Sequence, residues 1–204
     1  MAVEVVAPFR AIPGRTGELL GFNYALPVDP LDERLPAAID AVWARYRALH
    51  EPLRIEFNEE TWPALGAALE RAGLVLESRN PLMACEPEEF RHFAAPSVVV
   101  RFLESDPRHP STLRAVGELH GQVAGRASIG TVDGVAELYG VLTDPPFRRR
   151  GVAATICSAL IERQFHEGGT LVFLDAENPG AEALYAGLGF RRIGVRLSYA
   201  EPPP

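Results

Sequence analysis

A strand, a basic loop and a helix follow one another in residues 136–165, which read AELYGVLTDPPFRRRGVAATICSALIERQF. Residues 136–142 are apolar enough for a buried strand, and residues 154–165 repeat apolar side chains at helical spacing. Where a loop ends a strand and begins a helix, unpaired backbone N–H groups meet the positive end of the helix dipole. We therefore expect an anion-binding loop at residues 148–154.

The composition of this loop favours a pyrophosphate as the anion. Gly151 lets the backbone come close to a ligand, and Ala153 keeps the first helical turn slim. Arg148, Arg149 and Arg150 add guanidinium charge that persists at any physiological pH. A Walker loop is excluded because the chain has no lysine, and the dinucleotide pattern GxGxxG is absent. The simpler alternative is an arginine-rich turn that only begins a helix.

A second strand and a second helix follow at residues 171–190. Residues 171–174 form a short apolar strand, and Asn178 followed by Pro179 is typical of a helix N-cap and first helical position. Apolar residues then recur at helical spacing through Tyr185, and glycines after it end the helix. Taken alone, Asn178 would be only a cap and Tyr185 only a helix aromatic. Together and in this order, the basic loop and the segment from Asn178 to Tyr185 indicate a single functional site.

Two motifs carry a resemblance to a known family. Arg-x-x-Gly-x-Ala at residues 148–153 and Asn-x-x-Ala-x-x-Leu-Tyr-x-x-x-Gly-Phe at residues 178–190 resemble segments of the GCN5-related N-acetyltransferases, the GNAT superfamily. The resemblance covers residues 97–200 and implies an α/β fold with a mixed α+β sheet. It also implies an N-acyltransferase that moves an acetyl group from acetyl-CoA, its cosubstrate, directly to an amine acceptor.

The resemblance assigns coenzyme binding to three segments. The backbone of residues 141–143 would lie along the pantetheine arm like an added strand, where an N–H group can polarise the thioester carbonyl. The loop and the start of the following helix would hold the pyrophosphate. The implied coenzyme-binding residues are Val141, Leu142, Thr143, Arg148, Arg149, Arg150, Gly151, Val152, Ala153, Ala154 and Asn178.

Two side chains are candidates for proton transfer. By period two, Glu137 shares a strand face with Tyr139, Val141 and Thr143. Its position before the basic loop matches the base-bearing glutamate in the histone-acetylating branch of the family, although a structural ion pair with a nearby arginine is the alternative. Tyr185 is the candidate acid for the departing thiolate, since a phenol has a pKa of about 10.

Composition limits the other functions. The net charge of -7 argues against generic nucleic-acid binding, and no apolar run approaches the length of a membrane span. Two distant cysteines and five scattered histidines give neither a disulfide framework nor a metal site. Cys157 lies on the apolar stripe of its helix, so we interpret it as core. Without a basic leader at the N-terminus, we expect a reducing, cytoplasmic location.

The Pro- and Glu-rich stretch 86–96 predicts a boundary between residues 1–94 and residues 95–204. The first part repeats the order strand–helix–strand–helix–strand of the second, so it resembles a degenerate GNAT-like domain in tandem with the coenzyme-binding one. It lacks the glycine loop, and Trp62 and Leu69 align with Asn178 and Tyr185. The other explanation is that the two parts acquired the same alternation of strands and helices independently. The expected elements of the first part are residues 19–26, 35–50, 53–57, 59–72 and 74–77.

The second part departs from the family in one respect. The family usually has two helices between its first two strands, where they cover the acceptor. Here only residues 104–112 separate the strand at 98–103 from the next strand at 113–116. The acceptor site would then be covered on that side by the acidic first part or by the second subunit of a homodimer. The rival function is a non-catalytic acyl-CoA-binding or regulatory module, which needs neither Glu137 nor Tyr185.

Overall fold

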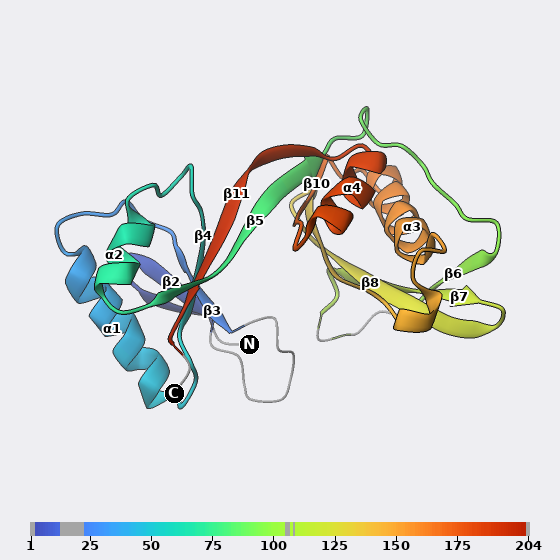
Figure 1. Cartoon of the computed structure of the whole chain (residues 1–204). Helices are drawn as coiled ribbons and strands as arrows, with labels where there is room; N and C mark the ends of the chain where they lie inside the picture. Colours follow the sequence, from blue (N-terminus) through green and yellow to red (C-terminus); the bar gives the residue numbers. More distant parts are fainter. Residues whose placement is uncertain (1–2, 13–22, 105–106, 108, 203–204) are drawn as a thin grey trace. The chain divides into compact units, whose positions relative to one another are not determined.

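Figure 1 shows the computed structural model of the chain, which describes residues 3–12, 23–104, 107 and 109–202. The chain divides into two compact units. The first unit comprises residues 1–80 and 194–204, and the second comprises residues 81–193. The sequence predicted the boundary between residues 94 and 95. The functions assigned to the two parts stay predictions.

The first unit begins with a small antiparallel group of strands and continues with two strand–helix pairs. Strands β1 to β3 pair antiparallel, β3 pairs with β4 in parallel, and β4 pairs with β11 antiparallel. The elements in chain order are β1 (Glu4–Val6), β2 (Phe9–Ile12), β3 (Tyr24–Pro27), α1 (Leu35–Ala48), β4 (Arg54–Asn58), α2 (Leu65–Arg71) and β5 (Val75–Cys85).

The second unit holds an antiparallel meander that leads into the predicted strand–loop–helix. Strands β6 to β9 pair antiparallel in sequence order, β9 pairs with β10 in parallel, and β10 pairs with β5 antiparallel. The mixed sheet confirms the predicted fold class, with strand order β1-β2-β3-β4-β11-β5-β10-β9-β8-β7-β6. The remaining elements are β6 (Val98–Phe102), β7 (Thr112–Leu119), β8 (Gln122–Val132), β9 (Val135–Thr143), a 3-10 turn (Pro145–Phe147), α3 (Val152–His166), β10 (Leu171–Asp175), α4 (Pro179–Gly187) and β11 (Arg191–Ala200).

The predicted helix at residues 59–72 is wrong in length, because α2 begins only at Leu65. Pro63 lacks an N–H donor and disfavours helical backbone at the residue before it, so the chain makes a turn there instead. The amides of Thr61 and Trp62 both donate to the Asn58 carbonyl in that turn. Of the expected strand at 19–26, residues 19–22 lie outside the described residues, and β3 begins at Tyr24.

One apolar cluster holds the second unit together. Ile156 and Leu160 of α3 are fully buried against Ala136 and Leu138 of β9, and α4 contributes Tyr185 to the same cluster. Burying one such aliphatic side chain stabilises a fold by about 1.5–3 kcal/mol. Both helices therefore pack on the Leu138 side of the strands, with α3 crossing β6 to β9 (Figure 1).

The repeated element order is present in the structure as β3-α1-β4-α2-β5 and β9-α3-β10-α4-β11. Both second helices end alike: Gly73 and Gly189 have φ of 96° and 101°, and the next amides donate back to Leu69 and Tyr185. The last strand of each series pairs with the other series, since β11 pairs with β4 and β5 pairs with β10. That these series are tandem GNAT-like halves stays a prediction.

Candidate active site

Strands β9 and β10 separate halfway along their length. Their parallel pairing runs from Val135 with Leu171 to Glu137 with Phe173 and stops there. β9 nevertheless continues to Thr143, where it still pairs with β8. None of the described strands therefore pairs with the edge of residues 138–143 that faces β10, and its backbone groups are available to an extended ligand.

A β-bulge at Gly140 changes which side chains share a face of β9. Gly140 has φ of 61°, and the register with β8 shifts between Arg126 and Ser128. Because a bulge adds one residue, Val141 packs into the cluster with Leu138 while Leu142 is exposed. The sequence-based expectation that Glu137 shares its face with Val141 and Thr143 is therefore wrong, because period two does not continue through a bulge.

The basic loop ends against the N-terminus of α3, as the sequence predicts. Gly151 is the N-cap residue, with φ of 78°, and Arg149 is also left-handed, with φ of 62°. A non-glycine residue in that region is uncommon and costs about 1–3 kcal/mol, so the loop is held in shape by its surroundings. No side chain caps α3, so its first N–H groups have no side-chain acceptor and are available to an anion.

Thr143 and Arg148 connect the strand edge to this loop. The Arg148 Nε donates to the Thr143 carbonyl at 3.2 Å. The Thr143 hydroxyl is buried and has no hydrogen-bond partner among the described residues. An orphaned buried hydroxyl costs about 1–3 kcal/mol, so it marks a place where a polar ligand atom fits. The pyrophosphate and pantetheine of acetyl-CoA therefore fit the residues present here.

The segment before β6 also contributes to the loop, and the sequence analysis did not find it. The Phe93 and Ala95 amides donate to the hydroxyls of Ser158 and Thr155 at 2.9 and 3.0 Å, which fastens this segment to α3. A side chain added at Gly151 would meet the Ala95 Cβ at 3.0 Å and the Phe93 ring at 3.2 Å. A side chain at position 151 would therefore crowd Ala95 and Phe93 whether or not a ligand is bound.

Glu137 lies on the sheet face that is opposite to α3. It pairs with Gly130 of β8 on one side and with Phe173 of β10 on the other. Tyr139 lies two residues further on the same face, where its hydroxyl is 3.4 Å from the Thr112 hydroxyl. This carboxylate is therefore at the point where the two strands separate, beside the free edge of β9.

Tyr185 comes from α4 and lies in the apolar cluster, only 7% exposed. Its ring packs against Phe190 at 5.8 Å between centroids. Burial raises the pKa of its phenol above the ordinary value, and the neighbouring Cys157 and two carboxylates add to the shift. Asn178 caps the same helix: its side-chain oxygen accepts from the Ala181 amide at 3.0 Å. The phenol therefore stays protonated, and Asn178 has a structural role.

Both cysteines lie in surroundings that disfavour the reactive thiolate form. Cys85 and Cys157 are both free and fully buried. Burial raises the pKa of the Cys157 thiol to about 12. Burial, and to a smaller extent the Glu89 carboxylate, raises the pKa of the Cys85 thiol to about 11. A thiol with such a pKa carries almost no thiolate near neutral pH. The interpretation of Cys157 as a core residue is therefore consistent with its surroundings.

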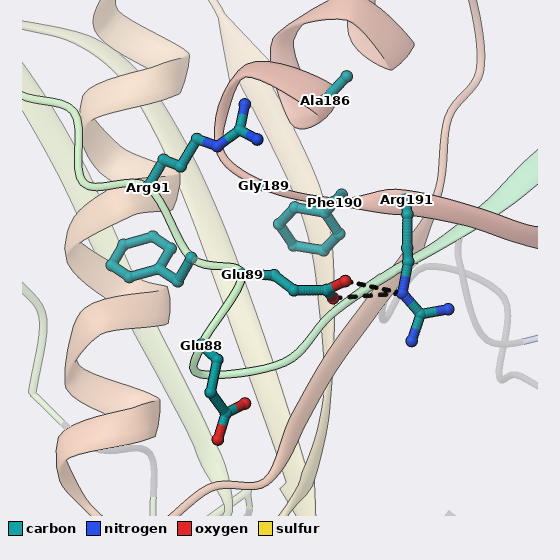
Figure 2. A pocket seen from close by; sticks show the side chains of 8 residues that line it. Glu88, Glu89, Arg91, Ala186, Gly189, Phe190 and Arg191 are labelled. Atoms are coloured by element: carbon teal, nitrogen blue, oxygen red, sulfur yellow. Dashed lines mark hydrogen bonds and ion pairs between the residues drawn. The ribbon is translucent and has the colours of Figure 1, made fainter.

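A surface cavity of the second unit lies away from these residues. Its volume is about 340 Å³, and none of the predicted site residues lines it. Figure 2 shows it beside the ion pair of Arg191 with Glu89, which ties the 86–91 segment to the start of β11. The lining residues are Glu88, Glu89, Phe90, Arg91, Ala186, Gly189, Phe190 and Arg191.

The described residues contain no cluster of histidine, cysteine and acidic side chains arranged to hold a metal ion. None of their helices is long and apolar enough to cross a membrane.

Comparison with known proteins identifies the family. The sequence pattern of the acetyltransferase (GNAT) family matches residues 76–190, so the chain belongs to this family. The chain is 30% identical over 114 residues to the N-alpha-acetyltransferase RimI of Mycobacterium tuberculosis, a match that covers 48% of this chain and 70% of that protein.

Two further relatives agree with the family. The chain is 35% identical over 66 residues to the [ribosomal protein bS18]-alanine N-acetyltransferase of Salmonella typhimurium, covering 31% of this chain and 45% of that protein. The fold matches a GCN5-related N-acetyltransferase from Kribbella flavida with a TM-score of 0.85 and 23% identity, over 100% of this chain and 90% of the other. The protein is therefore an acetyltransferase whose family uses acetyl-CoA as cosubstrate, as the sequence predicts.

Proposed function

We propose that this protein moves an acetyl group from acetyl-CoA to the free α-amino group of a polypeptide by direct transfer. The separation of β9 from β10 directly beside the anion site of α3 carries the proposal. The names of the two sequence relatives, one an N-alpha-acetyltransferase and the other a ribosomal-protein-alanine N-acetyltransferase, support an α-amino acceptor.

In this proposal the coenzyme binds along a continuous surface. The backbone N–H groups of residues 151–154 and the guanidinium groups of Arg148, Arg149 and Arg150 hold the pyrophosphate. The pantetheine arm lies against the free edge of β9 at residues 141–143, with the Thr143 hydroxyl as a further partner. A backbone N–H at the bulge polarises the thioester carbonyl.

The reaction removes two protons from the acceptor nitrogen and leaves a negative charge on the sulfur, which must be stabilised. The acceptor arrives as an ammonium ion, and Glu137 takes a proton from it, directly or through one water. The amine nitrogen then attacks the carbonyl carbon, the C–S bond breaks, and the sulfur leaves as a thiolate. The amide keeps the acetyl group, and the second proton of the nitrogen goes to the base or to solvent.

For Tyr185 we propose a role other than complete proton transfer to the thiolate. A phenol is already a weaker acid than a thiol, and burial raises the pKa of Tyr185 further. Complete proton transfer to the thiolate would therefore be uphill. We expect the phenol to donate a hydrogen bond to the developing thiolate instead, an interaction that strengthens in the transition state.

The alternative is a module that binds acetyl-CoA without turnover. Such a module needs the anion site but not Glu137, so the two functions differ in what Glu137→Gln does. The decisive experiment incubates the full chain with acetyl-CoA and a peptide that has a free N-terminus, and measures coenzyme A release and peptide mass. A matched peptide with a blocked N-terminus is the control. Acetylation of only the free peptide supports the proposal, whereas release of coenzyme A without peptide acetylation contradicts it.

The division of labour between the parts is also proposed here. Where the second part has its arginine loop, the first has Asp32, Glu33 and Arg34 and no glycine, and Arg34 is paired with Asp32 at 2.6 Å. An acidic loop repels a pyrophosphate, so we expect one coenzyme per chain, held by the second part. The wall of the acceptor site would come from the first part or from a homodimer mate. Free cysteines suit a reducing cytoplasm.

A further inference from the structure

The sheet face that carries Glu137 has no helix on it among the described residues of the second unit. α3 contacts β6 to β9, and its side chains share one cluster with Ala136 and Leu138. α4 packs into the same cluster, so both helices occupy the opposite face. An acceptor therefore approaches Glu137 across a bare sheet, and the side chains on that sheet determine what it meets.

Three arginines gather on this bare face. Arg101 of β6 and Arg126 of β8 both pair with Val116 of β7, one from each side. Arg114 precedes Val116 by two residues on the same strand, so it points to the same face. Directly paired residues also share a face. We call Arg101, Arg114 and Arg126 the arginine face.

Burial of Val116 supports this arrangement. Val116 is only 8% exposed although no described helix of this unit covers it. Arginine stems lie along apolar surface while their charged ends stay in water, and Arg101 and Arg126 are indeed exposed residues. The stems therefore cover the valine and hold three guanidinium groups above it.

The arginine face is only partly neutralised. Arg101 forms an ion pair with Glu118 at 3.0 Å, and Arg114 donates to the Glu104 carbonyl at 3.3 Å. Arg126 makes no hydrogen bond or ion pair with the part of the chain that the structure describes. Glu118 is the only acidic side chain on this face of β6, β7 and β8 within the described residues. An excess of positive charge here contrasts with the net charge of -7 for the chain.

The arginine face continues into the proposed catalytic site. Arg114 pairs with Ser128, and Ser128 pairs with Tyr139. Neighbouring strands lie about 4.8 Å apart, so the Arg114 backbone is about 10 Å from that of Tyr139, next to Glu137. An extended peptide advances about 3.3 Å per residue. A peptide whose amino group is at Glu137 would therefore bring its third to fifth residues over the arginines.

Resting on the proposed function, we infer that the arginine face selects acceptor polypeptides whose third to fifth residues are acidic. Their carboxylates pair with Arg114 and Arg126, which no described carboxylate neutralises, and position the α-amino group at Glu137. The charge of the face excludes acceptors with a basic N-terminal segment by the same interaction.

Three peptides test this inference with the full chain and saturating acetyl-CoA. They begin Ala-Ala-Asp-Asp-Asp, Ala-Ala-Ser-Ser-Ser and Ala-Ala-Arg-Arg-Arg, and continue with one neutral tail. We expect kcat/KM to be about tenfold higher for the acidic than for the serine peptide, mainly through KM, and lowest for the arginine peptide. Because the contacts are solvent-exposed, 0.5 M NaCl should reduce the ratio to about two.

Two variants assign the preference to the arginine face. The double variant Arg114→Gln with Arg126→Gln should bring the acidic-to-serine ratio close to one. Arg163→Gln is the matched control, because Arg163 lies on α3, on the opposite face, and pairs with Glu167. It should keep the wild-type ratio.

Four results would overturn the inference. Equal rates for all three peptides would overturn this inference and leave the proposed function standing. A preference for the acidic peptide that survives in the double variant would do the same. A wild-type dimer that the double variant converts to a monomer would assign the arginine face to a second copy of this chain. Failure to acetylate any peptide would overturn the proposed function as well.

Discussion

Removing the end of β5 should unfold the second unit, because this strand completes its sheet. Residues 82–85 pair with β10 from Val172 to Asp175. Without them, β10 becomes an open edge beside the apolar cluster. The test compares a fragment of residues 81–193, which matches the compact unit, with a fragment of residues 86–193. The two differ only in residues 81–85.

The structure gives the size of the loss. Leu82 and Met83 are 7% and 2% exposed, and burial of two such side chains contributes about 3–6 kcal/mol. Strand hydrogen bonds add about 0.5–1.5 kcal/mol each. The total is about 4–8 kcal/mol, which is comparable with the whole stability of a domain, about 5–15 kcal/mol.

Urea unfolding followed by circular dichroism measures this difference. With a slope of about 2 kcal/mol per molar urea, a loss of 4 kcal/mol moves the midpoint down by about 2 M. We expect 81–193 to unfold cooperatively and 86–193 to show no native baseline, or to aggregate through the exposed β10 edge. In the full chain, Met83→Ala should lower the free energy of unfolding by about 2–5 kcal/mol.

Equal midpoints for the two fragments would refute this reasoning. They would mean that the second unit is equally stable with and without the pairing of β5 with β10. The pairing of each series' last strand with the other series would then contribute nothing to the free energy of unfolding. A cooperative 86–193 with a wild-type midpoint is therefore the decisive contrary result.

Three other predictions concern the site. Glu137→Gln should lower kcat by about 100-fold or more and remove the acidic limb of the pH–rate profile; wild-type rates across pH would place the base elsewhere. Tyr185→Phe should lower kcat by about tenfold to 100-fold with an unchanged Kd for acetyl-CoA, and an equal change in both would indicate a packing defect. Neither Cys85 nor Cys157 should react with Ellman's reagent at pH 8 in the native chain, because their pKa values of about 11 and about 12 keep the thiols protonated; rapid labelling of one thiol would contradict this.

The sequence was sufficient wherever local chemistry determines the structure. The strand, the helix that begins after Gly151 and the Asn178 cap of α4 follow from neighbouring residues alone, and the structure has all three, although only Ala136 and Leu138 of β9 are buried. The two glycine-ended helices are likewise present at the aligned positions Gly73 and Gly189.

Features that depend on distant residues were not predictable. Nothing within β5 indicates that it pairs with β10, because pairing depends on which strand edges are free after collapse. The bulge at Gly140 was missed because a glycine in a strand fits a bulge and an ordinary position equally well in a single sequence. Phe93 contacts Gly151 from a segment that carries no helix or strand pattern. The arginine face needed the strand register, since its members are distant in sequence.

The anion site at α3 is the centre of this account, and Gly151 is a poor position at which to test it. A larger side chain there would clash with Phe93 and Ala95 and strain a left-handed backbone, so lost binding would have two causes. Ala153→Asp is better, because a carboxylate in the first turn suits the helix dipole while it repels a pyrophosphate. Ala153→Asn has the same shape without the charge and is the matched control.

Calorimetric titration of the full chain with acetyl-CoA is therefore the most direct test. We expect one coenzyme to bind per chain. Its affinity should be retained in Ala153→Asn and weakened at least about tenfold in Ala153→Asp, with unchanged melting temperatures. Binding that is unaffected by Ala153→Asp, or a stoichiometry near two, would contradict this expectation.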